Sequence, residues 1–212
     1  MPAWRARAAD VAAQAAFARA SRWTGMNDEI LSERTVHTGW LTLQIATVRL
    51  RQGETVEREI VEHPSGAAIL AYDPTRRVAM LISECRPPVL KAGVAPLLEV
   101  IAGALDGDDP ERCARREARE EGGLRLDVLE KVAETWATPA TSTERVTSFL
   151  AAYGEADRVA AGGGLDEEAE HLRVREVPLA ELRRRMDAGE IGDAKTLLLL
   201  QALRIRQPAL FD

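Results

Sequence analysis

Three glutamates crowd into one short stretch near the middle of the chain. Glu117 and Glu121 are four residues apart, so on a helix they share one face, and Glu120 joins them from the side. Three carboxylates within about one helical turn repel one another unless a proton or a cation intervenes. A hard divalent cation such as Mg2+ is the natural neutraliser because it prefers oxygen ligands. The spacing therefore predicts a metal-binding cluster of carboxylates.

The residues around the cluster predict the helix that presents it. Asp109 can cap the amino end, Pro110 suits the first helical position, and Gly122-Gly123 supplies a left-handed stop. The alternative is a helix whose charges only face solvent, held by pairs such as Glu111 with Arg115.

With the glycine loop that precedes it, the stretch resembles a Nudix box, G-x5-E-x7-R-E-U-x-E-E-x-G-U, where U is apolar. The run from Arg116 to Leu124 fills the second half of this pattern. The first half departs from it, because the loop after Gly103 is one residue shorter and Asp108 or Asp109 replaces the usual glutamate. A short loop with the run Leu-Asp-x-Asp-x-Pro-Glu-x-Cys resembles the GDP-mannose pyrophosphatase branch of the family, a close relative of the ADP-ribose pyrophosphatases.

The resemblance implies a metal centre. The main-chain carbonyl of Ala102 and the carboxylates of Glu117 and Glu121 would bind Mg2+, with Mn2+ as an alternative. Glu120 would be a further ligand or would support the ligands. Arg116 lies four residues before Glu120 and is placed to pair with it, as an organiser of the site rather than a substrate group.

The catalytic base is expected in a late acidic loop that follows Gly162-Gly163-Gly164. The position that matches the family's catalytic glutamate is Glu168, which the resemblance also implies as a metal ligand, while Glu120 and Glu121 complete the catalytic set. Glu167 and Glu170 are close enough to compete for the role of base. The alternative is an acidic loop that is only solvated.

Substrate contacts also follow from the resemblance. Arg86 corresponds to an arginine at the diphosphate, where a guanidinium suits paired phosphate oxygens. Trp40 could stack on the base. For each such residue a structural role is the alternative. The full set is Trp40, Arg58 and Glu59 for the nucleotide, Arg86 and Gly103, Glu144 beside the terminal sugar or phosphate, and Lys195 near the mannose site.

Alternating apolar residues predict strands on both sides of the central helix. Pro87-Pro88 is expected to break the chain into a loop, and the apolar run 96–102 leads into Gly103. The other expected strands are 41–50, 54–62, 67–72, 77–83, 124–136, 146–153 and 172–177, and the last two helices are 178–188 and 193–203.

These elements suggest a mixed α/β fold. The resemblance covers roughly 30–206 and implies a Nudix-type α/β/α sandwich with a mixed sheet, preceded by a small N-terminal antiparallel sheet that commonly helps to build a homodimer. The expected organisation is an extension at 1–27, a β subdomain at 28–63 and a Nudix domain at 64–212. The extension is expected to be a helix or a mobile tail, with an organellar transit peptide as the alternative because it is rich in arginine and poor in acids.

Net charge and cysteine content limit the kinds of binding partner and the location expected for the protein. The net charge of -6 over 212 residues argues against a general binder of nucleic acid or anionic membranes. Two cysteines, Cys85 and Cys113, without a C-x-x-C motif fit a reducing cytoplasm, and no apolar run is long enough to span a bilayer. His37, His63 and His171 lack metal-ligand spacing and are expected on the surface or in turns.

The sequence thus predicts a Mg2+-dependent hydrolase of nucleoside diphosphate sugars. It would release a nucleoside monophosphate and a sugar phosphate, with GDP-mannose and ADP-ribose as the leading substrates. The rival is a catalytically silent Nudix-fold module that senses or regulates through a bound nucleotide. The three intact glutamates argue against this rival.

Overall fold

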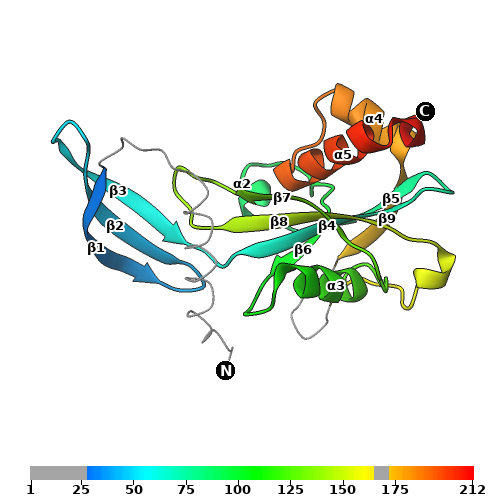
Figure 1. Ribbon diagram of the computed structural model, residues 1–212, viewed down its shortest axis with the longest axis horizontal. Helices are drawn as coiled ribbons and strands as arrows, with labels where there is room; N and C mark the ends of the chain where they lie inside the picture. Colours follow the sequence, from blue (N-terminus) through cyan, green and yellow to red (C-terminus); the bar gives the residue numbers. More distant parts are fainter. Residues whose placement is uncertain (1–27, 165–171) are drawn as a thin grey trace. The chain divides into compact units, whose positions relative to one another are not determined.

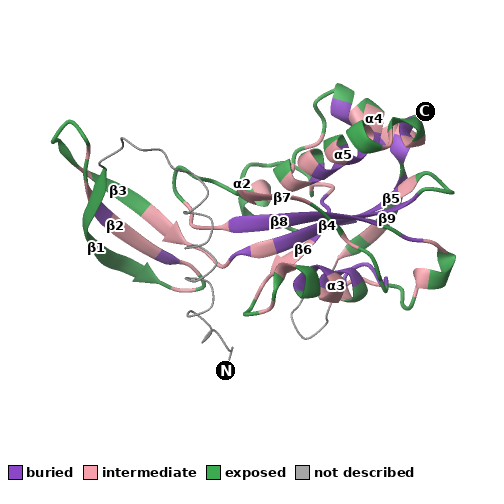
Figure 2. Ribbon diagram, viewed as in Figure 1, coloured by how far each residue is buried: buried purple, intermediate pink, exposed green. Residues whose placement is uncertain are grey.

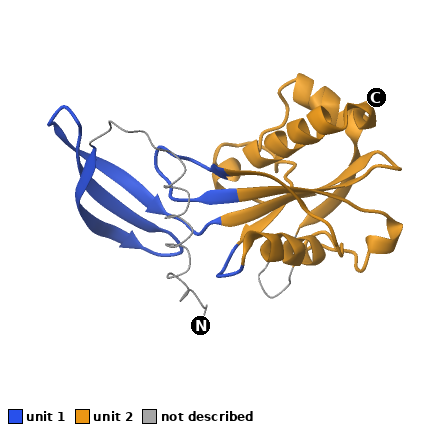
Figure 3. Ribbon diagram, in the orientation of Figure 1, with its two compact units in different colours: residues 1–65, 105–108, 135–146 blue, residues 66–104, 109–134, 147–212 orange. Residues whose placement is uncertain are grey.

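The computed structural model describes residues 28–164 and 172–212. The extension expected at 1–27 and the acidic positions Glu167, Glu168 and Glu170 lie outside the described residues. The described chain forms two compact units (Figure 3). Unit 1 holds 28–65, 105–108 and 135–146, and unit 2 holds the remainder.

Unit 1 contains a three-stranded antiparallel sheet in the order β1-β2-β3. Its strands are β1 (Glu29–Thr38), β2 (Thr42–Arg49) and β3 (Thr55–Glu62). Only the middle strand buries side chains, at Thr42 and Ala46, while every residue of β1 is exposed. This sheet accounts for the small antiparallel sheet expected at the start of the chain.

A six-stranded sheet organises the rest of the chain. Its order is β7-β8-β4-β5-β9, and β6 pairs antiparallel with β4. Strands β4, β5 and β8 are buried along most of their length (Figure 2), as expected for apolar runs covered on both faces. The strands are β4 (Gly66–Asp73), β5 (Val78–Ser83), β6 (Ile101–Ala104), β7 (Glu130–Trp136), β8 (Arg145–Ala152) and β9 (Arg173–Pro178).

Helices cover both faces of this sheet. In Figure 1, α3 (Pro110–Glu120) lies on one face, and α4 (Leu179–Asp187) and α5 (Ala194–Arg206) lie on the other. Each helix turns an apolar stripe inward, such as Leu199, Leu200 and Leu203 of α5. The α/β fold class, with a small antiparallel sheet and a larger mixed sheet, is confirmed.

Several boundaries differ from the expectation. The strand expected at 96–102 begins only at Ile101. A short helix, α2 (Pro87–Lys91), begins where the proline pair was expected to give a loop, because proline at the first helical position needs no N–H partner. The strand expected at 124–136 begins only at Glu130. The residue after Gly123 instead closes the central helix, since the N–H of Leu124 donates to the carbonyl of Ala118 at 2.9 Å. No helix among the described residues is long and apolar enough to cross a membrane.

Candidate active site

Helix α3 begins and ends as its sequence dictates. The Asp109 side chain accepts hydrogen bonds from the N–H groups of Glu111 and Arg112, at 3.0 and 3.1 Å, and Pro110 occupies the first turn. Gly123 adopts a left-handed φ of 64° at the other end. The helix is therefore fixed at both ends, and its direction determines which residues face the sheet.

The face toward the sheet carries two buried carboxylates. Glu117 is 8% exposed and Glu121 is 3% exposed. The N–H of Ala102 donates to Oε2 of Glu121 at 3.2 Å. Glu117 lies so close to Gly103 that a Cβ on that glycine would be 1.9 Å from its Oε1. The structure therefore brings Glu117 and Glu121 to the strand residues Ala102 and Gly103.

Arg116 ties the carboxylates of the helix together. Its Nη1 lies 2.8 Å from Oε1 of Glu117 and 3.1 Å from Oε2 of Glu120, and its Nη2 donates to the carbonyl of Ala104 at 3.2 Å. Burial lowers the pKa of Arg116, but the charge of Glu117 and the contact with Glu120 outweigh it and raise that pKa overall. The expected pairing of Arg116 with Glu120 is present.

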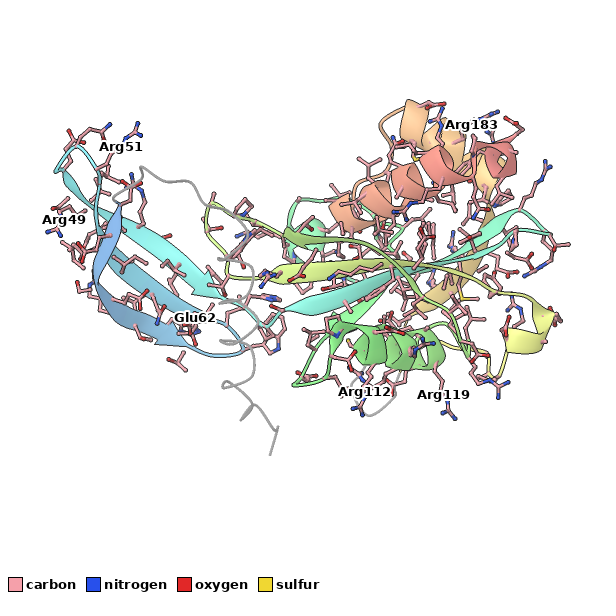
Figure 4. All side chains as sticks on the ribbon, viewed as in Figure 1. Arg49, Arg51, Glu62, Arg112, Arg119 and Arg183 are labelled. Atoms are coloured by element: carbon pink, nitrogen blue, oxygen red, sulfur yellow. The ribbon has the colours of Figure 1, made fainter. Side chains whose placement is uncertain are left out.

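The opposite face of the same helix is solvated. The labelled side chains of Arg112 and Arg119 point away from the sheet (Figure 4). The pair of Glu111 with Arg115 that the sequence suggested is also present, at 2.6 Å. Helix α3 thus has both predicted faces, one charged and exposed, the other carrying buried acids.

The guanidinium of Arg86 is bound by two glutamates. Its Nε and Nη2 donate to the two carboxylate oxygens of Glu99 at 3.1 and 3.2 Å, and its Nη1 lies 2.5 Å from Oε1 of Glu84. Burial lowers the pKa of Arg86, whereas the hydrogen bonds and charge of Glu99, with the charges of Glu84 and Glu121, raise it by more. The orientation of the Arg86 guanidinium is therefore fixed by the carboxylates of Glu99 and Glu84.

Lys195 forms an ion pair with Asp193 at the start of α5. Its Nζ lies 2.7 Å from Oδ1 of Asp193, which also caps the helix by accepting from the N–H of Thr196 at 2.8 Å. Burial would raise the pKa of Asp193, but the bonds from Lys195 and Thr196 hold it below its usual range. The hydroxyl of Thr196 in turn accepts from the N–H of Val100 at 2.8 Å. Lys195 therefore belongs to a network that anchors the segment leading into β6.

Four of the candidate substrate residues lie in unit 1. Trp40 is 73% exposed, and its ring meets the ring of His63 edge-on with centroids 4.9 Å apart. Nδ1 of His63 lies 3.9 Å from Oε1 of Glu144. Trp40, His63 and Glu144 thus form one cluster. Arg58 and Glu59 lie on β3, where both are exposed.

The described chain approaches the expected acidic loop from the end of α3. The N–H of Gly163 donates to the carbonyl of Glu121 at 2.8 Å, and that of Gly164 donates to the carbonyl of Glu120 at 3.2 Å. Gly164 is the last described residue before 165. The roles expected for Glu168, Glu167 and Glu170 remain predictions.

The donor set fits a hard divalent cation. Two buried carboxylates and nearby main-chain oxygens are ligands that Mg2+ or Mn2+ accepts. Within residues 28–164 and 172–212, no three acidic, histidine or cysteine side chains are already grouped at metal-ligand spacing. Arg116 contacts the carboxylates of both Glu117 and Glu120 beside this donor set.

The structure adds three polar residues to those predicted from the sequence: Glu99, Thr196 and His63. Glu99 stood inside an apolar run and Thr196 inside a helix, where neither spacing nor motif marks a polar partner. A buried charged or polar position in an apolar segment was the available signal, because such groups require a partner.

Comparison with known proteins defines the class. The model of the NUDIX domain matches residues 62–200. A GDP-mannose pyrophosphatase of Cronobacter sakazakii is 36% identical over 187 residues, which are 85% of this chain and 97% of the relative. GDP-mannose pyrophosphatases of Klebsiella pneumoniae and Escherichia coli are 33% and 35% identical, over 84% and 86% of this chain and 92% and 95% of their own. The chain belongs to the NUDIX domain family, so the resemblance stated from the sequence is confirmed.

Proposed function

We propose that this Nudix hydrolase cleaves the diphosphate of GDP-mannose with water, releasing GMP and mannose 1-phosphate. The observation that carries the proposal is the pair of buried carboxylates, Glu117 and Glu121, at Ala102 and Gly103. The relatives named GDP-mannose pyrophosphatase support the choice of substrate, because each aligns along more than nine-tenths of its own length. ADP-ribose is the second candidate of the same chemistry.

The residues assigned to the metal are Glu117, Glu121, Glu168 and the main-chain carbonyl of Ala102. When bound, Mg2+ would neutralise phosphate charge and polarise the phosphoryl oxygens, and Mn2+ is the alternative ion. Arg116 keeps the acids of α3 in one place through its contacts with Glu117 and Glu120.

Glu168 is proposed as the general base that takes a proton from the attacking water, with Glu120 and Glu121 completing the catalytic set. Glu167 and Glu170 are the alternatives for the base. Replacing each of the three with glutamine in turn identifies it, because loss of a general base lowers kcat by about two to four orders of magnitude. A fall of only a few-fold at all three positions would place the base elsewhere.

The remaining proposed roles are contacts with the substrate. Arg86 would meet the diphosphate, since a guanidinium suits paired phosphate oxygens, and Gly103 is a further proposed contact. Trp40 offers an exposed ring for stacking on the base, which accords with its 73% exposure. Arg58, Glu59, Glu144 and Lys195 are the further proposed substrate contacts.

We also propose a homodimer in the cytoplasm that binds neither nucleic acid nor membrane. The net charge of -6 supports the absence of polyanionic partners. Sedimentation of the full chain tests the dimer, and a monomeric mass would contradict it.

Product analysis tests the proposed reaction. The protein is incubated with Mg2+ and, separately, with GDP-mannose and ADP-ribose, and the products are separated. GMP with mannose 1-phosphate is the expected result. AMP with ribose 5-phosphate would retain the mechanism and change the substrate. Tight binding of either compound without turnover would favour the sensing module and contradict the hydrolase.

A further inference from the structure

Glu99 is a buried acid two residues before β6. It is 4% exposed, and its backbone is fixed by two hydrogen bonds with Ile82, at 2.8 and 2.9 Å. Burying an ion pair costs desolvation energy and often adds no net stability. An interior carboxylate in a strand bridge therefore calls for a reason other than stability.

The carboxylate of Glu99 binds the guanidinium of Arg86 through both of its oxygens. Its two oxygens accept from Nε and Nη2 of Arg86, the parallel arrangement that gives a guanidinium one orientation. Glu84 contacts the remaining nitrogen, Nη1. These contacts use three of the five N–H groups of an arginine, so two remain for a further anion.

The charge of one candidate metal ligand also acts on Arg86. The Glu121 carboxylate acts on Arg86 by Coulomb attraction. The Arg86 guanidinium and the two carboxylates of Glu84 and Glu99 together carry one net negative formal charge. The group as a whole does not attract phosphate, so its two remaining N–H groups can act only through their direction.

We propose that Glu99 is a positioning residue, whose carboxylate orients the Arg86 guanidinium so that its remaining N–H groups meet the diphosphate of the substrate. The proposal rests on the proposed function. Glu99 itself touches no substrate in this arrangement and acts entirely through Arg86.

A double-mutant cycle tests this role in the full chain. The affinity for GDP in the presence of Mg2+ is measured by calorimetry for the parent, Glu99→Gln, Arg86→Ala and the double variant. Because directly contacting residues couple, Glu99→Gln should weaken binding about tenfold in the parent and less than about twofold in the Arg86→Ala background. An equal loss in both backgrounds, or no loss in the parent, would overturn the proposal.

The control removes a comparable carboxylate elsewhere. Nε and Nη2 of Arg185 both donate to Glu181 on α4, at 2.9 and 2.5 Å, so Glu181→Gln also breaks an arginine pair and should leave GDP affinity unchanged. If Glu99→Gln does not fold, Glu99→Asp replaces it, since this variant retains the charge but is too short to span the same contact. The double-mutant cycle with Arg86→Ala is then measured with Glu99→Asp, and the same outcomes support or overturn the proposal.

Kinetics separate this proposal from the proposed function. With GDP-mannose, Glu99→Gln should raise KM and lower kcat together, while the Mg2+ concentration for half-maximal rate stays unchanged. A changed Mg2+ requirement would assign Glu99 to the metal site and overturn the positioning role. A parent that binds GDP without cleaving GDP-mannose would contradict the hydrolase, and the binding cycle would still decide the role of Glu99. A parent that binds no GDP would contradict both.

Discussion

At the scale of single residues, the site depends on how closely backbone and carboxylate approach. Glu117 fills the space that any side chain at Gly103 would need, since an added Cβ would lie 1.9 Å from Oε1 and 2.2 Å from Cδ. Such contacts are far inside the van der Waals distance. The glycine therefore sets where the Glu117 carboxylate can lie.

Gly103→Ala should accordingly disable the site more than the fold. The new methyl group pushes Glu117 away from the strand, and a displacement of about 1 Å at a catalytic group can cost about a hundredfold in rate. The measurement is kcat with GDP-mannose, alongside the melting temperature. Gly154→Ala is the matched control, because the nearest atom to its added Cβ is 4.0 Å away. Equal rates in the two variants would show that the Glu117 position does not matter.

At the scale of elements, α5 holds the segment that enters β6. The Thr196 hydroxyl accepts from the N–H of Val100 at 2.8 Å and donates to Oδ2 of Asp193 at 2.7 Å. Both Thr196 and Val100 are buried. One side chain thus fastens the helix cap to the strand that carries Ala102.

Thr196→Val should lower the free energy of unfolding by about 1–3 kcal/mol, because the buried N–H of Val100 loses its acceptor. Denaturant titration measures the change, and hydrogen exchange reports on the Val100 amide directly. Thr196→Ser is the control, since it retains the hydroxyl and loses only a methyl group. Faster exchange at Val100 in the valine variant alone is expected, and equal exchange in both variants would contradict the assignment.

Another network of unit 2 gathers around Glu176 on β9. Both oxygens of Glu176 accept from Arg76, at 2.8 and 2.6 Å, and its Oε1 also contacts Arg158 and the hydroxyl of Tyr153. The bonds from Arg76, with those of Tyr153 and the charge of Arg158, outweigh burial and lower the pKa of Glu176. Burial and the bond to Glu176 raise the pKa of Tyr153.

This network should make stability depend on pH in acid. Because the folded pKa of Glu176 is depressed, its contribution is complete above the unfolded value of about 4.3 and is lost as the pH falls through the folded value. Glu176→Gln should therefore flatten the decline of the unfolding free energy below about pH 5. Glu190→Gln, at an exposed position, should retain the parent slope. If the unfolding free energy of Glu176→Gln fell with pH as steeply as that of the parent, the Glu176 carboxylate would not be the cause of the acid dependence.

At the scale of the whole molecule, the sequence predicted what is local. The cap at Asp109, the stop at Gly123 and the shared face of Glu117 and Glu121 depend on spacing within one helix, and the structure contains all of them. The partner of Glu99 was not predictable, because strand pairing and chain reversal bring Arg86 to it from another segment.

The same limit applies to unit 1. His63 was expected on the surface or in a turn, without a role in the site. In the structure it contacts both Trp40 and Glu144, which lies 81 positions further along the chain. No periodicity relates residues so far apart in sequence. Candidate substrate residues such as Trp40 and Glu144 were found through resemblance, while their common neighbour was not.

On the proposed function, the buried carboxylates of α3 carry metal-dependent cleavage of a diphosphate. The most direct test is the initial rate of GDP-mannose cleavage against Mg2+ for the parent, Glu121→Gln and Glu111→Gln. Glu111 is the matched control, since it lies on the exposed face of the same helix. Removing a metal ligand withdraws several kcal/mol of charge stabilisation, so Glu121→Gln should lower kcat by about two orders of magnitude or more. Glu111→Gln should match the parent. A Glu121→Gln rate within a few-fold of the parent, in a folded protein, would contradict the account.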